Sequence, residues 1–344
     1  MRRGRLSIPP SAKIRSALRS CRGGWQLPLQ SIARYILAMI AKITLGTRGS
    51  DLARAQTLLV ENAIRSTHPN VIIDTKIIIT RGDNAKVVDL AAGRKGLFTA
   101  EIERALLAGE VDAAVHSAKD LPSQTRRGAQ IAAVLPRAPI NDLLISKHSG
   151  GLDSLPNGAT VATGSVRRQR QLHWKRADLK VVDLRGNVPT RLRKLAENEW
   201  DGIVLARAGL ERLGFSPTQT DIGFEGGQFS VEILPCEIFL PAGGQGIIAL
   251  QVRSDDLSTK ALLESVSDRE TLLCLQAERE FLSRLHADCN FPVGVQATIS
   301  NGKMKLRAQM FEGESSTPRQ AEVEGESDEG DQLAAELLRK IEQG

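Results

Sequence analysis

Aromatic side chains are scarce in this sequence, at 3% of 344 residues, so it lacks the stacked rings that usually hold unpaired bases. The four cysteines lie far apart and form no C-x-x-C pair, which argues against a disulfide framework or a zinc site. No apolar run is long enough to span a membrane. G-x-x-x-x-G-K-[ST] is absent, as is G-x-G-x-x-G from the first strand–helix turn. The cysteine usage fits a reducing compartment.

Acidic residues are absent from residues 1–40, which carry eight Lys and Arg and are broken by Pro9-Pro10 and Gly23-Gly24. Three interpretations fit this composition: a transit peptide, an upstream extension of a chain that starts at Met39, or a basic tail that contacts an acidic surface. All three place the segment outside the folded protein. We expect a cytoplasmic protein, or a plastid or mitochondrial one if the segment is a transit peptide.

After residue 40, apolar strands alternate with amphipathic helices along the sequence, which predicts parallel, doubly wound α/β sheets. The strands expected in two successive units cover residues 42–46, 71–80, 111–115, 131–135, 142–146, 159–163, 179–184 and 201–206. Residues 215–239 are rich in glycine and are predicted to be an irregular connection, after which residues 240–251 form a glycine turn and a strand that returns to the first unit. A third unit contains a long helix at residues 269–284.

Basic side chains occur where several of these strands end, namely at Arg48, Arg81, Lys119 and Arg185. More of them fall in the first turns of the following helices, namely Arg167, Arg168 and Arg191. Helix N-termini bind anions, and the guanidinium fork suits carboxylates and phosphates. Because strand ends meet at one sheet edge, the pattern predicts a cleft for a small molecule with many negative charges. Nucleic acid fits less well, since the cations occupy turns rather than one helix face.

A single acid, Asp120, follows a strand among these cations. Taken alone, an Asp at such a point is more often a turn cap. Among cations, its carboxylate can instead stabilise a cationic intermediate or relay a proton to a leaving amine. Its neighbours His116 and Ser117 stay undecided, because they can simply hold the strand end in place. Cys289 lies in a Gly- and Pro-containing loop and is either an inert thiol or a covalent anchor.

Several strings together resemble the motifs of the porphobilinogen deaminase (hydroxymethylbilane synthase) family. They are V-H-S-A-K-D (115–120), T-G-S-V-R-R-Q-R-Q-L (163–172), L-R-G-N-V-P-T-R-L (184–192), L-P-A-G-G-Q-G (240–246) and C-N-F-P-V-G (289–294). G-T-R-G-S (46–50), T-R-G-D (80–83) and K-G-L-F (95–98) add to the match. The motifs keep the family's order from about residue 42 to the C-terminus.

The resemblance implies an α/β fold with two periplasmic-binding-protein-like, doubly wound domains and a smaller α+β C-terminal domain. We expect domain 1 in residues 42–136 with 238–254, domain 2 in residues 140–232 and domain 3 in residues 257–344. The family's reaction joins four porphobilinogens head to tail on a covalent dipyrromethane cofactor and releases ammonia each time, in tetrapyrrole biosynthesis. The acetate and propionate of each pyrrole would account for a cationic cleft. We expect a monomer with no nucleic-acid or membrane partner. Its product would pass to uroporphyrinogen-III synthase.

The matching motifs also imply residue roles. Asp120 would be the catalytic acid, which protonates the departing amine and stabilises the azafulvene-like cation, and Cys289 would hold the cofactor through a thioether. Cofactor carboxylates would be bound by Lys119, Ser165, Arg167, Arg168 and Arg191. The incoming or growing chain would be bound by Arg48, Ser50 and Arg185, with Lys95 bordering the site and Phe98 covering the cleft.

Two other functions compete with this one. A non-catalytic anion-binding protein of the same architecture is the stronger alternative, because fold alone does not set function. Such a binder would need neither Asp120 nor Cys289. The second is a nucleic-acid-binding protein, which strongly salt-dependent DNA binding by a chain starting at Met39 would support.

Overall fold

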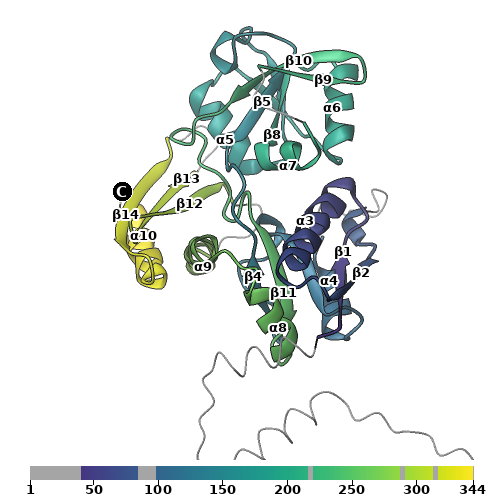
Figure 1. Ribbon diagram of the computed structural model, residues 1–344. Helices are drawn as coiled ribbons and strands as arrows, with labels where there is room; N and C mark the ends of the chain where they lie inside the picture. The colour runs from purple at the N-terminus through teal and green to yellow at the C-terminus, as the bar shows by residue number, and fades with distance from the viewer. Residues whose placement is uncertain (1–39, 84–97, 216–219, 287–290, 313–316, 344) are drawn as a thin grey trace, which may run out of the picture.

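The computed structural model describes residues 40–83, 98–215, 220–286, 291–312 and 317–343. Within these ranges the strands form three sheets, placed in a lower lobe, an upper lobe and a third unit beside both (Figure 1). No helix in the same ranges is long and apolar enough to cross a membrane. Two of the predicted site residues, Lys95 and Cys289, lie outside the described residues.

The lower lobe is built on a five-stranded sheet in the order β2-β1-β3-β11-β4. Its strands and helices are β1 (Lys42–Thr47), α3 (Asp51–Thr67), β2 (Ile72–Ile77), α4 (Ala100–Leu107), β3 (Ala113–Ser117), β4 (Ala129–Val134), β11 (Ile248–Arg253) and α8 (Leu257–Glu264). Leu45 of β1 packs with Val60 and Ile64 of α3, because apolar residues recur at the periods of strand and helix.

Helix α8 belongs to this lobe as well. Its Leu262 and Leu263 are fully buried in the same core as β1 and α3. The expected start of a third domain at residue 257 is therefore too early, because α8 packs on the first sheet.

The upper lobe is built on a six-stranded sheet in the order β7-β6-β8-β5-β10-β9. Its elements are β5 (Asp142–Ser146), β6 (Thr160–Ala162), α5 (Val166–Lys175), β7 (Lys180–Val182), α6 (Val188–Glu197), β8 (Gly202–Ala206), α7 (Arg207–Arg212), β9 (Asp221–Phe224) and β10 (Gly227–Ile233). Asn187 begins α6, because its Oδ1 accepts a hydrogen bond from the Thr190 N–H at 2.9 Å and Pro189 follows in the first turn.

The predicted irregular connection at residues 215–239 is wrong in part, because β9 and β10 form a hairpin there. Its turn residues, Glu225 and Gly226, have φ values of 47° and 82°, the left-handed pair that suits a two-residue hairpin turn. Gly226 therefore serves the turn of this hairpin.

The α/β class is confirmed, although both large sheets are mixed rather than purely parallel. β1 is parallel to β2 and β3, whereas β11 is antiparallel to β3 and β4. In the upper sheet, β6 is parallel to β7 and β8, whereas β5 is antiparallel to β8 and β10. The chain crosses to the upper lobe after β4 and returns into β11, as predicted. The returning strand enters its sheet from the edge that faces the other lobe, so it runs against its neighbours.

The third unit is an antiparallel sheet with two helices. Its elements are α9 (Arg269–Arg284), β12 (Val293–Ser300), β13 (Lys303–Met310), β14 (Arg319–Glu326) and α10 (Gly330–Gln343). α9 also contacts the lower lobe, where its Leu275 packs with Ala118 and Leu121 just after β3. This contact packs the third unit against the segment that carries Asp120.

Candidate active site

The turn that carries Asp120 is fixed from two sides. β3 ends in the 3₁₀ turn Ala118–Asp120, in which Ala118 is buried and Asp120 is exposed. The Ala118 N–H donates to the Ile247 carbonyl at 3.0 Å, and Leu121 packs on Leu275 of α9. The packing of this turn holds the carboxylate of Asp120 in place.

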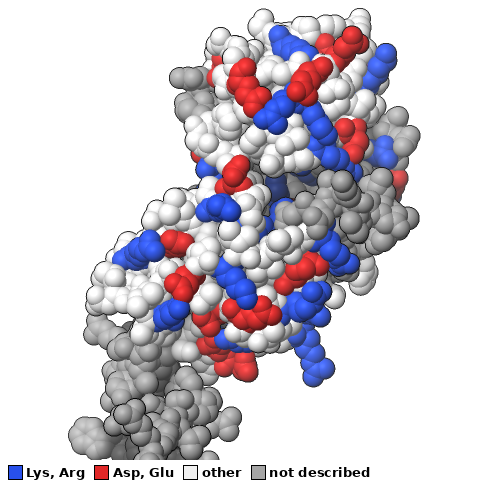
Figure 2. Space-filling view, turned by 90° about the vertical axis from the view of Figure 1, so that its right-hand side faces the viewer, with Lys and Arg blue, Asp and Glu red and all other residues white. Residues whose placement is uncertain are grey.

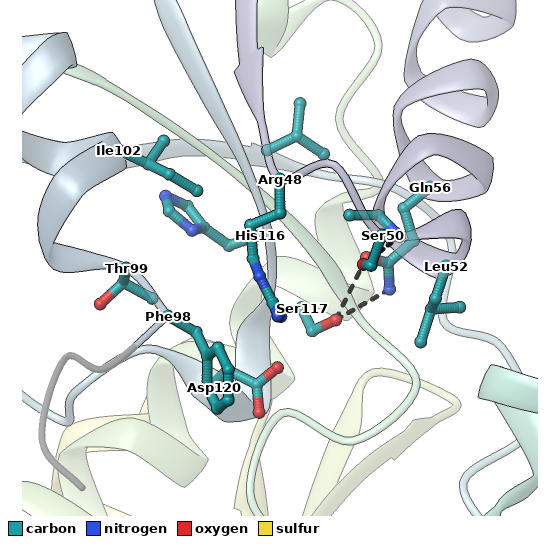
Figure 3. Close-up of a pocket in the computed structure, with 12 residues that line it drawn as sticks. Arg48, Ser50, Leu52, Gln56, Phe98, Thr99, Ile102, His116, Ser117 and Asp120 are labelled. Carbon is teal, nitrogen blue, oxygen red and sulfur yellow. Dashed lines mark hydrogen bonds between the residues drawn. The ribbon is translucent and has the colours of Figure 1, made fainter. Parts of the chain in front are cut away.

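Asp120 lines a pocket of the lower lobe together with Arg48, Ser50 and Phe98 (Figure 3). The Arg48 guanidinium carbon lies 4.2 Å from the centroid of the Phe98 ring, which is cation–π geometry. Ser50 is the N-cap of α3, and its Oγ accepts a hydrogen bond from the Ala53 N–H at 3.4 Å. The structure thus brings together four of the predicted site residues.

His116 and Ser117, which the sequence left undecided, form part of the pocket wall. His116 is 4% exposed, and burial lowers its pKa to about 4, while its interaction with the Gln251 side chain opposes the shift. Ser117 Oγ accepts a hydrogen bond from Gln56 Nε2 at 2.8 Å. His116 is therefore neutral near neutral pH and adds no charge to the pocket.

Lys119, next to Asp120 in the chain, interacts electrostatically with cations of the upper lobe. Burial, and then the positive charge of Arg168, lower the pKa of Lys119 to about 8, while Asp120 and Asp142 oppose the shift. Arg191 behaves similarly: burial and Arg168 lower its pKa to about 10, against Asp120 and Asp183. These mutual effects show that the cations of both lobes share one electrostatic environment with Asp120.

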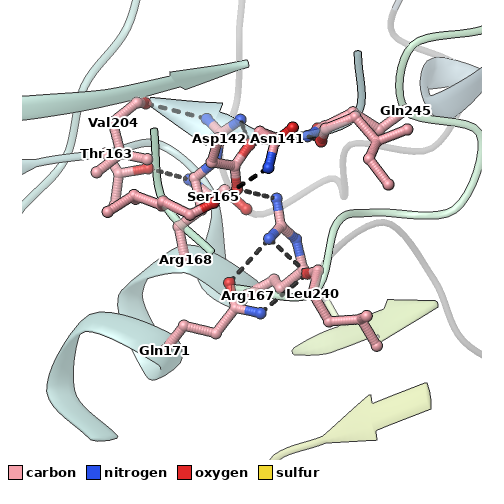
Figure 4. A network of polar contacts seen from close by, with 12 residues as sticks. Asn141, Asp142, Thr163, Ser165, Arg167, Arg168, Gln171, Val204, Leu240 and Gln245 are labelled. Atoms are coloured by element: carbon pink, nitrogen blue, oxygen red, sulfur yellow. Dashed lines mark hydrogen bonds and ion pairs between the residues drawn. The ribbon is translucent and has the colours of Figure 1, made fainter. Parts of the chain in front are cut away.

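Arg167 and Arg168, in the first turn of α5, are buried around Asp142 (Figure 4). Arg167 Nη2 donates to Asp142 Oδ2 at 2.9 Å, and Arg168 Nη2 donates to Asp142 Oδ1 at 2.7 Å. Further donations reach the Leu240 carbonyl from Arg167 and the Val204 carbonyl from Arg168. Burial lowers the pKa of Arg167 and the Asp142 carboxylate opposes the shift.

The other predicted cations are placed differently. Arg191 donates from Nε to the Gly186 carbonyl at 2.7 Å, and Arg185 is exposed and pairs with Asp183 at 2.6 Å. Ser165 is the N-cap residue of α5, with no side-chain cap hydrogen bond among the described residues. Arg81, expected at the same strand edge, pairs with Glu101 at 3.0 Å and does not line the pocket.

Positive charge exceeds negative charge in this region. Lys and Arg side chains are visible in the hollow between the two lobes (Figure 2). Four cations, Lys119, Arg167, Arg168 and Arg191, influence one another's pKa values, and three carboxylates among the described residues act on them, Asp120, Asp142 and Asp183. The buried Nε atoms of Arg167 and Arg168 find no hydrogen-bond partner among those residues either. Because the cations outnumber the carboxylates and excess positive charge in a partly buried region is costly, the region suits an anionic ligand.

The fold and the site thus define a class, two-lobed α/β proteins with a cationic region around an exposed carboxylate. Residues 43–261 match the family model "Porphobilinogen deaminase, dipyromethane cofactor binding domain", and residues 272–343 match "Porphobilinogen deaminase, C-terminal domain". The chain belongs to the porphobilinogen deaminase family.

Curated relatives match over most of the chain. The porphobilinogen deaminase of Syntrophomonas wolfei is 41% identical over 87% of this chain and 94% of its own length. That of Roseiflexus sp. strain RS-1 is 44% identical over 77% and 84%. Among solved structures, the methionine binding protein MetQ is similar with a TM-score of 0.39 and 14% identity, covering 67% of this chain and 92% of its own.

Sequence reasoning missed one central residue, Asp142. It begins the apolar stretch D-L-L-I-S, and the sequence analysis assigned it to a strand and gave it no further role. The signal was present, because an acid at the start of an otherwise apolar buried strand needs a cationic partner. Gln245, whose Nε2 donates to Asp142 Oδ1 at 2.8 Å, lies in the glycine turn at residues 243–246 and was also given no role.

Proposed function

We propose that this chain catalyses the porphobilinogen deaminase reaction, the stepwise head-to-tail condensation of four porphobilinogens with release of ammonia, giving hydroxymethylbilane. The observation that carries the proposal is the placement of Asp120. Its carboxylate is exposed on a rigid turn, lines a pocket with Arg48 and Phe98, and lies in the field of Lys119.

Asp120 is the group that handles charge at the reacting carbon. Release of ammonia breaks the bond between the aminomethyl carbon and nitrogen, and the electron pair leaves with nitrogen. A proton from Asp120 is transferred to the departing nitrogen, which leaves as ammonia. The carboxylate that remains then offsets the positive charge left on the pyrrole and its methylene carbon, where a fixed anion stabilises the transition state.

The residues present fit a dipyrromethane with its acetate and propionate groups. The unpartnered, buried Nε atoms of Arg167 and Arg168 and the cationic excess around Lys119 call for carboxylates at this point. Lys119, Ser165, Arg167, Arg168 and Arg191 would hold those carboxylates, and Cys289 would anchor the cofactor. When bound, the cofactor supplies the free pyrrole end to which the first substrate is joined.

The remaining predicted residues serve the substrate. Arg48, Ser50 and Arg185 bind carboxylates of the incoming pyrrole or of the growing chain, with Lys95 at the border of the site. Phe98 covers the pocket and keeps the guanidinium of Arg48 directed toward it through their stacked contact.

The wider setting follows from the same assignment. We propose three domains: residues 42–136 with 238–254 and the following helix α8, residues 140–232, and a third that begins after α8. The protein acts as a monomer in the cytoplasm, away from membranes and nucleic acid, and passes its product to uroporphyrinogen-III synthase.

The test compares Asp120→Asn with the native chain in one assay of ammonia release and hydroxymethylbilane formation. We expect the variant to fold and keep its cofactor, and to lose about 100-fold or more in turnover. Asp255→Asn, at an exposed turn near α8, is the matched control and should keep native turnover. Near-native turnover by Asp120→Asn would contradict the role of this carboxylate, and no hydroxymethylbilane from the native chain would contradict the function.

A further inference from the structure

Asp142 is a buried carboxylate whose two oxygens both accept hydrogen bonds from the arginines of the site. It is fully buried, and it accepts hydrogen bonds from Arg167, Arg168 and Gln245 at 2.9, 2.7 and 2.8 Å. Burial raises the pKa of Asp142, but the two guanidinium groups outweigh burial and hold it well below its usual range. The residue is therefore an anion near neutral pH.

The carboxylate fixes two side chains that are otherwise among the most flexible in proteins. A free Arg side chain gives up about 2 kcal/mol of rotamer entropy when it is held in one conformation. Asp142 takes one Nη group of each arginine, one on each of its oxygens, and so sets the orientation of both guanidinium planes at once. It also offsets the repulsion between two adjacent positive charges.

The same carboxylate also links the arginine pair to the two chain segments that connect the lobes. Asp142 begins β5, directly after the chain crosses into the upper lobe, and Gln245 lies on the returning passage. Gln245 Nε2 bridges Asp142 Oδ1 and the Ile140 carbonyl, at 2.8 and 2.6 Å. The orientation of the arginine pair is thus set relative to both crossings and not to α5 alone.

We propose that Asp142 is a positioning residue, which holds Arg167 and Arg168 as a preformed pair that receives the carboxylates of the dipyrromethane when the cofactor is first assembled. The inference rests on the proposed function. It assigns Asp142 no contact with the substrate and no part in proton transfer at Asp120.

Cofactor assembly can be followed separately from turnover. Full-length protein is produced in cells that lack porphobilinogen, porphobilinogen is added, and intact mass is recorded over time below the melting temperature of every variant. We expect Asp142→Asn to gain the dipyrromethane mass at least 10-fold more slowly than the native chain. Asp256→Asn is the matched control, because Asp256 is a partly buried carboxylate that pairs with Arg253 at 2.6 Å beside α8. It should load at the native rate.

A second variant covers the case in which Asp142→Asn does not fold. Asp142→Glu keeps both arginines paired but moves the carboxylate by one methylene, and it too should load more slowly than the native chain. In either variant the loading rate should fall by a larger factor than kcat of the loaded fraction, which a general loss of stability would not produce. Native loading rates in the folded variant would overturn the inference. A native chain that never gains the mass would instead overturn the proposed function.

Discussion

Replacement of Gly244 by alanine is expected to displace the turn that carries Asp120, because the added Cβ would press on the backbone of that turn. Gly244 has a φ of 74°, and a Cβ there would lie 3.0 Å from the Ala118 carbonyl carbon and 3.0 Å from the Lys119 nitrogen. Both contacts are with backbone atoms of the turn that carries Asp120, so a side chain cannot simply rotate away. The Gly244 N–H is also held by Glu278 Oε2 at 2.7 Å, which keeps the glycine from retreating.

The magnitude has two parts. A left-handed conformation costs an L-residue about 1–2 kcal/mol, and overpacking against fixed backbone costs about 1–3 kcal/mol more. Gly244→Ala should therefore lower the free energy of unfolding by about 2–5 kcal/mol. Displacement of Asp120 by a fraction of an ångström should also lower kcat by about 10- to 100-fold, because catalysis depends steeply on the placement of the reacting groups.

A control variant separates the cost of the left-handed backbone conformation from the cost of steric contact with the turn. Gly109 has a φ of 73° and no described atom within 4 Å of a built Cβ. Gly109→Ala should thus lose only about 1–2 kcal/mol and keep native kcat. Denaturant unfolding and steady-state kinetics on both variants measure the difference. Equal kcat values for Gly244→Ala and Gly109→Ala would refute the reasoning.

Two further predictions concern the cations of the site. In cofactor-free protein, Lys119 has a folded pKa of about 8 and an ordinary value of 10.5. Between these values the unfolded chain binds the proton and the folded chain does not, so the free energy of unfolding should rise with pH across that window. Lys119→Met should flatten this rise in denaturant titrations, and an equal slope in both proteins would contradict the burial of a charged Lys119. Phe98→Leu removes the cation–π contact with Arg48, worth about 0.5–2 kcal/mol. It should raise KM for porphobilinogen about 2- to 30-fold, and an unchanged KM would show that Phe98 does not orient Arg48.

Much of the fold could be predicted from local pattern. The β3 strand and the α9 helix were visible because apolar residues recur at the period of one element, and Asn187 with Pro189 marked the start of α6. The β9–β10 hairpin was missed because glycine at residues 223, 226 and 227 signals both irregular chain and tight turns. The antiparallel course of β11 could not be predicted either, since it depends on where the returning chain enters the sheet.

The candidate site could likewise be predicted only in part. Asp120, Arg48 and Lys119 follow strands, and the topology alone brings such positions to one edge. The inward orientation of Arg167 and Arg168 could not be predicted, because it depends on Asp142, a residue of another strand whose local sequence indicates only burial. The pairing of Arg185 with Asp183, two residues earlier, likewise depends on the backbone geometry at the end of β7.

Intact-mass measurement of the native chain and of Cys289→Ser, both produced with porphobilinogen available, tests the central claim most directly. The account predicts that the native protein carries the added mass of one dipyrromethane and that Cys289→Ser has the bare mass of its sequence. A bare mass for the native chain, or the same added mass on Cys289→Ser, would contradict it.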